Sequence, residues 1–80
     1  MTKEEIINIV NNFLIESFEI EENKIKEEAS LKEDLEIDSL DFVDIVVLID
    51  RHFGFKIKPE EMTGIKTLSQ FYDYIESKKN

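Results

Sequence analysis

One serine in this sequence occupies a position where a hydroxyl could do chemistry. Ser39 stands in EIDSLDFVDIVVLID, residues 36–50, between an aspartate and a leucine at the start of a mainly apolar segment. A serine nucleophile needs a base within reach. The only histidine, His52, would lie about 20 Å further along the same helix. Ser39 is therefore not part of an intramolecular catalytic triad.

Ser39 could instead serve as an attachment point. A hydroxyl in the first turn of a helix is exposed, and the free backbone N–H groups there favour an attached phosphate. The plain alternative is a serine that only helps to cap the helix.

The rest of the chain offers no self-contained reactive site. It has no cysteine, which excludes thiolate chemistry and disulfides. No stretch has the spacing of an EF-hand calcium loop or of a glycine-rich phosphate loop, and we expect no metal site. His52 is interpreted as a solvated residue that suits the end of a helix. The sequence thus predicts a protein that is not an enzyme.

Acidic residues dominate the charge of the chain. It has 10 basic and 19 acidic residues and a net charge of −9, with no basic residue between Glu33 and Asp50. This sign argues against nucleic acid as a partner and favours a basic protein surface. The alternative is that the acids only keep a small domain soluble.

The length and hydropathy predict one small domain over residues 1–80. No apolar run approaches the roughly 20 residues that a membrane span needs. The N-terminus has acids before its apolar part and does not resemble a signal peptide. We expect a cytoplasmic monomer.

Hydrophobic periodicity predicts an all-α fold with three main helices, one short helix and a long first loop. The first helix is expected at about 3–17 and the loop at 19–37. Asp38 is the expected N-cap of the second helix, which Gly54 ends, although its β-branched residues let a buried strand compete. The short helix is expected at about 59–63 and the last at about 68–78.

The apolar faces of these helices predict the core. Its expected members are Ile6, Phe13, Leu14, Ile45, Val46, Ile49, Phe53, Phe71 and Ile75. Six further apolar residues could hold the first loop against this core, namely Ile20, Ile25, Ala29, Leu31, Leu35 and Ile37.

The stretch from Ala29 to Met62 resembles the acyl carrier proteins of fatty-acid and polyketide synthesis. The resemblance depends on Glu33-Asp34-Leu35, on Asp38-Ser39-Leu40-Asp41 and on a following apolar helix with acids at Asp41 and Asp44. It extends more loosely to GIKTLSQFYDYI near the end, and it implies a four-helix acyl-carrier-like bundle.

The same resemblance implies a function. Ser39, between Asp38 and Leu40, would be esterified by 4′-phosphopantetheine taken from coenzyme A by a phosphopantetheinyl transferase. The arm ends in a thiol that carries acyl groups as thioesters. The other implied partners are acyl ligase, synthase or acyltransferase enzymes with basic surfaces.

Some residues depart from the family pattern. Residues 36–37 are Glu-Ile where a glycine is common, and Phe42 stands where a small or polar residue is usual. Leu48 replaces a frequently smaller residue, and Arg51 and His52 replace acids. These departures favour a dedicated pathway with its own ligase or synthase.

One face of the second helix is the predicted partner surface. Its members are Leu40, Asp41, Val43, Asp44, Val47, Leu48 and Arg51. The valines could equally belong to the ordinary core. Two rival functions stay open: an aminoacyl or peptidyl carrier, and a protein-binding module of the same fold that is never modified.

Overall fold

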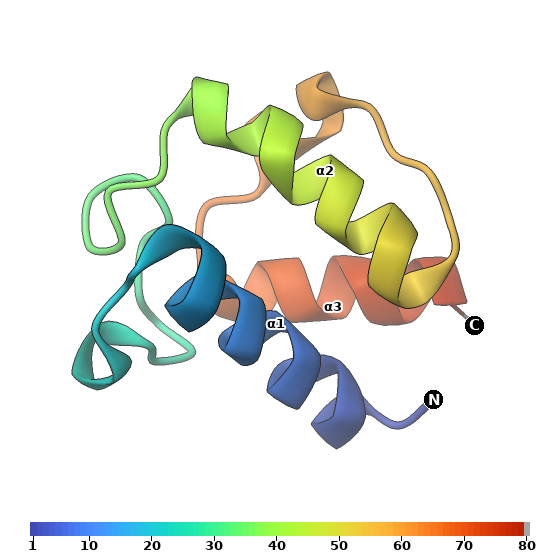
Figure 1. The fold of residues 1–80 in the computed structure, drawn as a ribbon, viewed down its shortest axis with the longest axis horizontal. Helices are drawn as coiled ribbons and strands as arrows, with labels where there is room; N and C mark the ends of the chain where they lie inside the picture. The colour runs from blue at the N-terminus through green and yellow to red at the C-terminus, as the bar shows by residue number, and fades with distance from the viewer. Residues whose placement is uncertain (80) are drawn as a thin grey trace.

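Three α-helices and two short 3₁₀ helices make up the fold (Figure 1), a computed structural model that describes residues 1–79. In chain order they are α1 (Lys3–Phe18), η1 (Glu22–Lys24), α2 (Ser39–Phe53), η2 (Pro59–Gly64) and α3 (Leu68–Lys79). The predicted all-α bundle is confirmed, and the main helices begin and end within one residue of the predicted bounds. The short helix is a 3₁₀ helix that includes Gly64.

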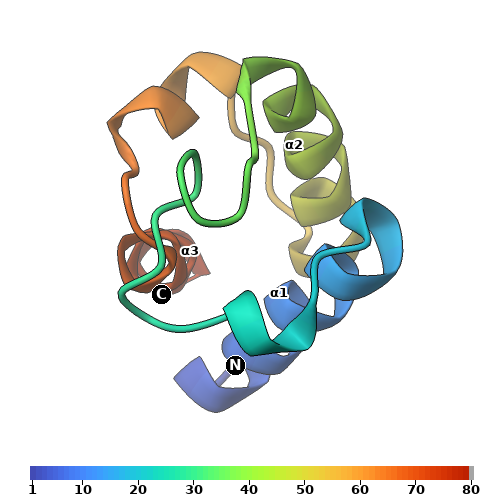
Figure 2. The same ribbon diagram turned by 90° about the vertical axis from the view of Figure 1, so that its left-hand side faces the viewer.

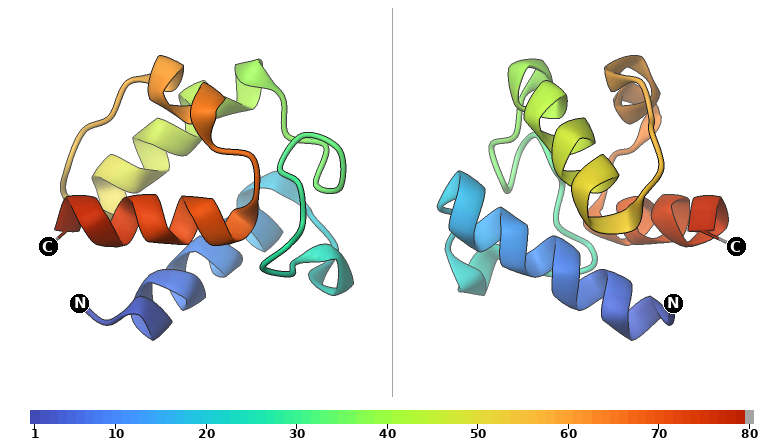
Figure 3. Two further views of the ribbon diagram at one scale, coloured as in Figure 1. Left: turned by 180° about the vertical axis from the view of Figure 1, so that it is seen from behind. Right: turned by 45° about the vertical axis from the view of Figure 1, so that its right-hand side comes forward.

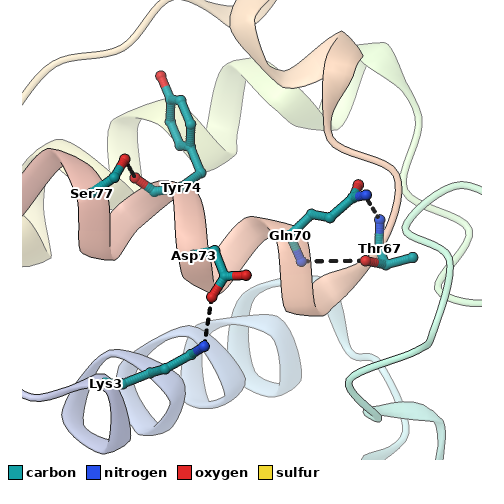
Figure 4. Close-up of polar contacts among 6 residues, drawn as sticks. All are labelled: Lys3, Thr67, Gln70, Asp73, Tyr74 and Ser77. Carbon is teal, nitrogen blue, oxygen red and sulfur yellow. Dashed lines mark hydrogen bonds and ion pairs between the residues drawn. The ribbon is translucent and has the colours of Figure 1, made fainter.

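Side chains close the start of the last helix. The Thr67 hydroxyl oxygen accepts the Gln70 N–H at 3.2 Å, and Gln70 Oε1 accepts the Thr67 N–H at 3.3 Å (Figure 4). The Lys3 ammonium pairs with the Asp73 carboxylate and joins α1 to α3. This pair is exposed, so it adds little to stability.

Eight of the nine predicted core residues are buried. The exception is Val46, which is only half-buried and packs against the edge of the core. The prediction for Val46 is wrong because α2 buries only a narrow stripe, composed of Ile45, Ile49 and Phe53. Ile57 and Met62, which periodicity did not identify, are buried from the connection after α2 and from η2.

The first loop is held in place along most of its length. Five of its six predicted apolar contacts are buried, and Ile25 is half-buried. The loop also pairs with the segment before α3: the Leu31 N–H donates to the Lys66 carbonyl and the Leu68 N–H to the Ala29 carbonyl, each at 3.0 Å. Figure 2 shows this loop crossing one end of the long helices. It brings residues 30–33 beside residues 65–67.

The start of α2 lies at a junction of several segments. It adjoins η2 and the end of the first loop in Figure 1 and in the view from behind in Figure 3. The N-terminus and the end of α3 lie at the other end of the molecule. There the Lys79 ammonium donates to the Phe53 carbonyl at 3.0 Å and closes the end of α2.

Tyr72 makes stability depend on pH in alkali. Burial raises the pKa of Tyr72 to about 12, and its hydroxyl donates to Asn11 Oδ1. The folded state therefore favours the neutral phenol, whose stabilisation is complete below the ordinary pKa of about 10 and is lost as the pH rises towards 12. One such group contributes at most about 1.4 kcal/mol for each pH unit.

We expect the free energy of unfolding of Tyr72→Phe to fall less steeply than that of wild type between pH 10 and pH 12. Urea unfolding followed by circular dichroism measures both slopes. Tyr74, whose pKa burial also raises to about 12, titrates in both proteins and does not affect the comparison. Parallel curves would contradict the assignment to Tyr72.

Candidate functional site

Ser39 is the first residue of α2, and its side chain is exposed. The preceding residue, Asp38, is the N-cap: its Oδ1 accepts the N–H groups of Leu40 at 2.9 Å and Asp41 at 3.2 Å. In return, Asp41 Oδ2 accepts the Asp38 N–H at 3.1 Å. The predicted N-cap is confirmed, and this reciprocal cap fixes the turn that carries Ser39. Because Asp38 and Asp41 make these bonds, the Ser39 hydroxyl is not needed for the cap.

The backbone before Ser39 turns sharply at Glu36 and is held to the first loop at Ile37. Glu36 has a φ of 57°, in the left-handed region that residues other than glycine seldom adopt. Ile37 follows with 2% exposure and donates its N–H to the Leu31 carbonyl at 2.8 Å. Glu36 thus takes a glycine-like conformation where the sequence departs from the usual glycine.

A groove of about 530 Å³ opens beside Ser39. Its volume is within the range of small-molecule sites. Buried Leu31, Ile37 and Met62 contribute apolar surface, and Phe42 is a half-buried wall residue. The remaining lining residues are Ser30, Lys32, Glu33, Asp38, Thr63, Ile65 and Lys66.

The sequence alone did not identify most of this groove. Met62, Thr63, Ile65 and Lys66 reach it from more than twenty residues beyond Ser39, and Lys32 lies before it. No local pattern carries that information, because the pairing of the first loop with the segment before α3 brings these segments together. The sequence did identify Ser39 and Asp38 as site residues, and it marked Phe42 as a departure from the family pattern.

The predicted partner face of α2 is at the surface. Leu40 is 79% exposed, Val43 52% and Val47 51%. The two valines are therefore not ordinary core residues. Asp44 and Arg51 are exposed, while Asp41 and Leu48 are half-buried. A smaller hollow of about 220 Å³ lies against this face, between α2 and the end of α1.

His52 is at the other end of α2 from Ser39. Its ring stacks on Phe13 of α1, with the centroids 6.0 Å apart and the planes 18° apart. The sequence-based separation of His52 from Ser39 is confirmed, since both lie on one helix. Among residues 1–79, no cluster of side chains has the makeup of a metal site. Of the helices described, none has the length and hydropathy to cross a membrane.

Comparison with known proteins gives a consistent result. A family model described as "Phosphopantetheine attachment site" matches residues 9–75. "Acyl carrier protein" from Lactobacillus johnsonii is 34% identical, and the match covers 100% of both chains. "Acyl carrier protein" from Coprothermobacter proteolyticus is 38% identical, over 96% of this chain and 94% of the relative. "Acyl carrier protein" from Thermotoga maritima is 36% identical, over 96% and 95%.

The family's prosthetic group is a covalently attached 4′-phosphopantetheine. The described residues fit such a group, because an exposed hydroxyl at the start of α2 adjoins a groove with both apolar and polar lining. The chain belongs to the acyl carrier protein family, and its cofactor is this phosphopantetheine arm.

Proposed function

We propose that Ser39 is the residue to which the 4′-phosphopantetheine is attached. One observation carries the proposal: Ser39 is exposed, stands first in α2 and lines the groove. Asp38 holds the turn that presents the hydroxyl, and exposed Leu40 offers an apolar contact beside it. When attached, the arm supplies a terminal thiol that can carry acyl groups.

The chain itself supplies the acceptor oxygen and no base. Ser39 Oγ would form a bond to the pantetheine-bearing phosphorus of coenzyme A while the pyrophosphate P–O bond breaks and adenosine 3′,5′-bisphosphate leaves. The Oγ proton goes to a base on the modifying enzyme, because His52 lies about 20 Å away along α2. In this proposal residues 1–80 act as one monomeric carrier domain without turnover of their own.

The partners that suit this chain are a phosphopantetheinyl transferase and acyl ligase, synthase or acyltransferase enzymes with basic surfaces. The charge of −9 supports this, since opposite charges speed encounter. The exposed face of α2, with its acids, its apolar residues and Arg51, is the proposed contact surface.

The pathway is fatty-acid synthesis, polyketide synthesis or a related dedicated route. Of these we favour a dedicated route. Arg51 and His52 are exposed at the end of α2 where the family commonly has acids, and Arg51 places a positive charge there. A partner with an acid opposite Arg51 would gain from this difference.

The intact mass of the protein from its own cell separates the rival functions. A phosphopantetheine adduct excludes the unmodified binding module. An acyl group on the arm supports the acyl carrier, whereas an aminoacyl or peptidyl group supports an aminoacyl or peptidyl carrier. An unmodified mass in cells with an active transferase would contradict the proposal.

Phe42 is expected to limit the acyl chain that the groove can hold. Its ring is half-buried and lines the groove with Ser39, one turn into α2. Phe42→Ala removes that wall, so longer acyl chains should give the greatest protection against heat. The measurement is the melting temperature of holo protein loaded with acyl chains of increasing length, for wild type and variant.

Phe55→Ala is the matched control for Phe42→Ala. Phe55 is also half-buried, but it does not line the groove. The control should lose stability without a change in the preferred chain length. The same preferred length in all three proteins would count against a role for Phe42.

A further inference from the structure

Two lysines border the groove beside Ser39 in an otherwise acidic neighbourhood. Lys32 and Lys66 both line it, and both residues are exposed. Within residues 1–79, the single ion pair joins Lys3 to Asp73 at a different place. Neither groove lysine is therefore held by a carboxylate of the described chain.

Backbone pairing joins the two segments that carry these lysines. The Leu31 N–H donates to the Lys66 carbonyl at 3.0 Å, so Lys32 follows directly on a residue paired with Lys66. The Lys66 N–H donates in turn to Gln70 Oε1 at 2.8 Å. These bonds use main-chain groups of Lys66 and leave both ammonium groups available to a ligand.

A phosphate ester on Ser39 would need such cations. At the start of α2, the N–H groups of Leu40 and Asp41 already donate to the Asp38 carboxylate and are not available to a phosphate. Asp38 and Asp41 also place negative charge on both sides of Ser39 in the sequence. Of the residues that line the groove, only Lys32 and Lys66 are basic, and their long flexible side chains suit a phosphate oxygen.

We propose that Lys32 and Lys66 bind the phosphodiester carried by Ser39. This contact would direct the arm along the apolar lining of the groove, formed by Leu31, Ile37 and Met62. This inference rests on the proposed function of Ser39. Its ligand class is an organic phosphodiester with one negative charge. The two lysines act as positioning residues and take no part in a reaction.

The test compares the apo and holo proteins. Each variant is loaded to completion with a phosphopantetheinyl transferase and coenzyme A, and its intact mass is checked. Its melting temperature is then measured in both forms, at low and at high salt. Lys32→Gln and Lys66→Gln should each lower the holo-minus-apo difference by about 1–4 °C at low salt, as expected for an exposed ion pair in a small domain. At 1 M salt this effect should vanish, because the screening length falls to about 3 Å.

Lys56→Gln is the matched control. Lys56 is exposed and carries the same charge, but it does not line the groove. Its holo-minus-apo difference should equal that of wild type. The ³¹P resonance of the diester should also shift in the two groove variants and not in the control.

The outcomes separate this inference from the proposal about Ser39. If wild type gains the arm and all three variants keep the wild-type difference, the lysine contact is wrong and the carrier function stands. If all three variants lose the same amount of the holo-minus-apo difference, the effect comes from total charge and not from position, and the contact is also wrong. If wild type gains no mass, the attachment at Ser39 fails, and the contact fails with it.

Discussion

Ser39→Ala is expected to abolish attachment of the phosphopantetheine arm. The variant removes the only hydroxyl of α2, which stands beside the groove, and an alanine cannot form a phosphate ester. Folding should be nearly unchanged, because the cap uses the carboxylates of Asp38 and Asp41 and because alanine favours a helix. The measurement is intact mass after incubation with a transferase and coenzyme A, together with the far-ultraviolet circular dichroism of both proteins.

Ser30→Ala is the sharpest control for this result. Ser30 lines the same groove, but it belongs to the first loop, where its hydroxyl accepts the Glu33 N–H at 3.2 Å. Its variant should gain one arm, as wild type does, with a stability loss of about 1 kcal/mol from the lost cap. A mass gain in Ser39→Ala, at any serine, would overturn the site assignment.

Charge reversal at Asp44 is expected to slow loading of Ser39 roughly 3- to 10-fold at low salt, mainly through weaker binding of the transferase. Asp44 is exposed on α2, on the same face as the exposed valines, and no described side chain pairs with it. Asp44→Lys should therefore leave stability nearly unchanged. The measurement is the loading rate against transferase concentration, at low and at high salt, where the difference should shrink.

Asp41→Lys should slow loading by a similar factor, but the structure gives Asp41 a second role. Its carboxylate accepts the Asp38 N–H, so the lysine variant loses part of the cap and places a cation at the positive end of the helix. The expected cost is about 1 kcal/mol of folding stability.

Asp50→Lys controls for total charge. Asp50 is an exposed residue of the same acidic block, about 16 Å along α2 from Ser39 and turned away from Asp41. It should load at close to the wild-type rate. If Asp44→Lys loads as fast as wild type at low salt, the acids of α2 serve solubility and not recognition.

Local signals in the sequence were enough to predict the helices and the start of the site. Asp38 was the expected N-cap and forms it with Asp41, three residues later, and Thr67 and Gln70 form a cap at the same spacing. Such bonds depend on residue type and spacing alone. The same logic placed Ser39 in the first turn of α2.

Contacts between distant segments were beyond this kind of prediction. The bridge between Ser30 and Thr67 joins two stretches with no pattern in common, and it builds much of the groove. Met62 is buried because η2 packs against α2. A helix of six residues is too short for its hydrophobic periodicity to predict this contact. The prediction that Val46 is buried was wrong for a different reason. An apolar residue on an apolar helix still lies at the edge of the core when the buried stripe of that helix is narrow.

The pairing of the first loop with the segment before α3 also orders events during synthesis. The Leu31 to Lys66 bond spans 35 residues, whereas the cap beside Ser39 spans three. Short-range contacts form early and long-range contacts form late. On a ribosome, Ser39 leaves the exit tunnel before residues 62–66 do, so it is exposed before the groove can form. An enzyme that recognises only the turn at Ser39 could act on the unfinished chain, whereas one that requires an arm lying in the groove must wait for the complete fold.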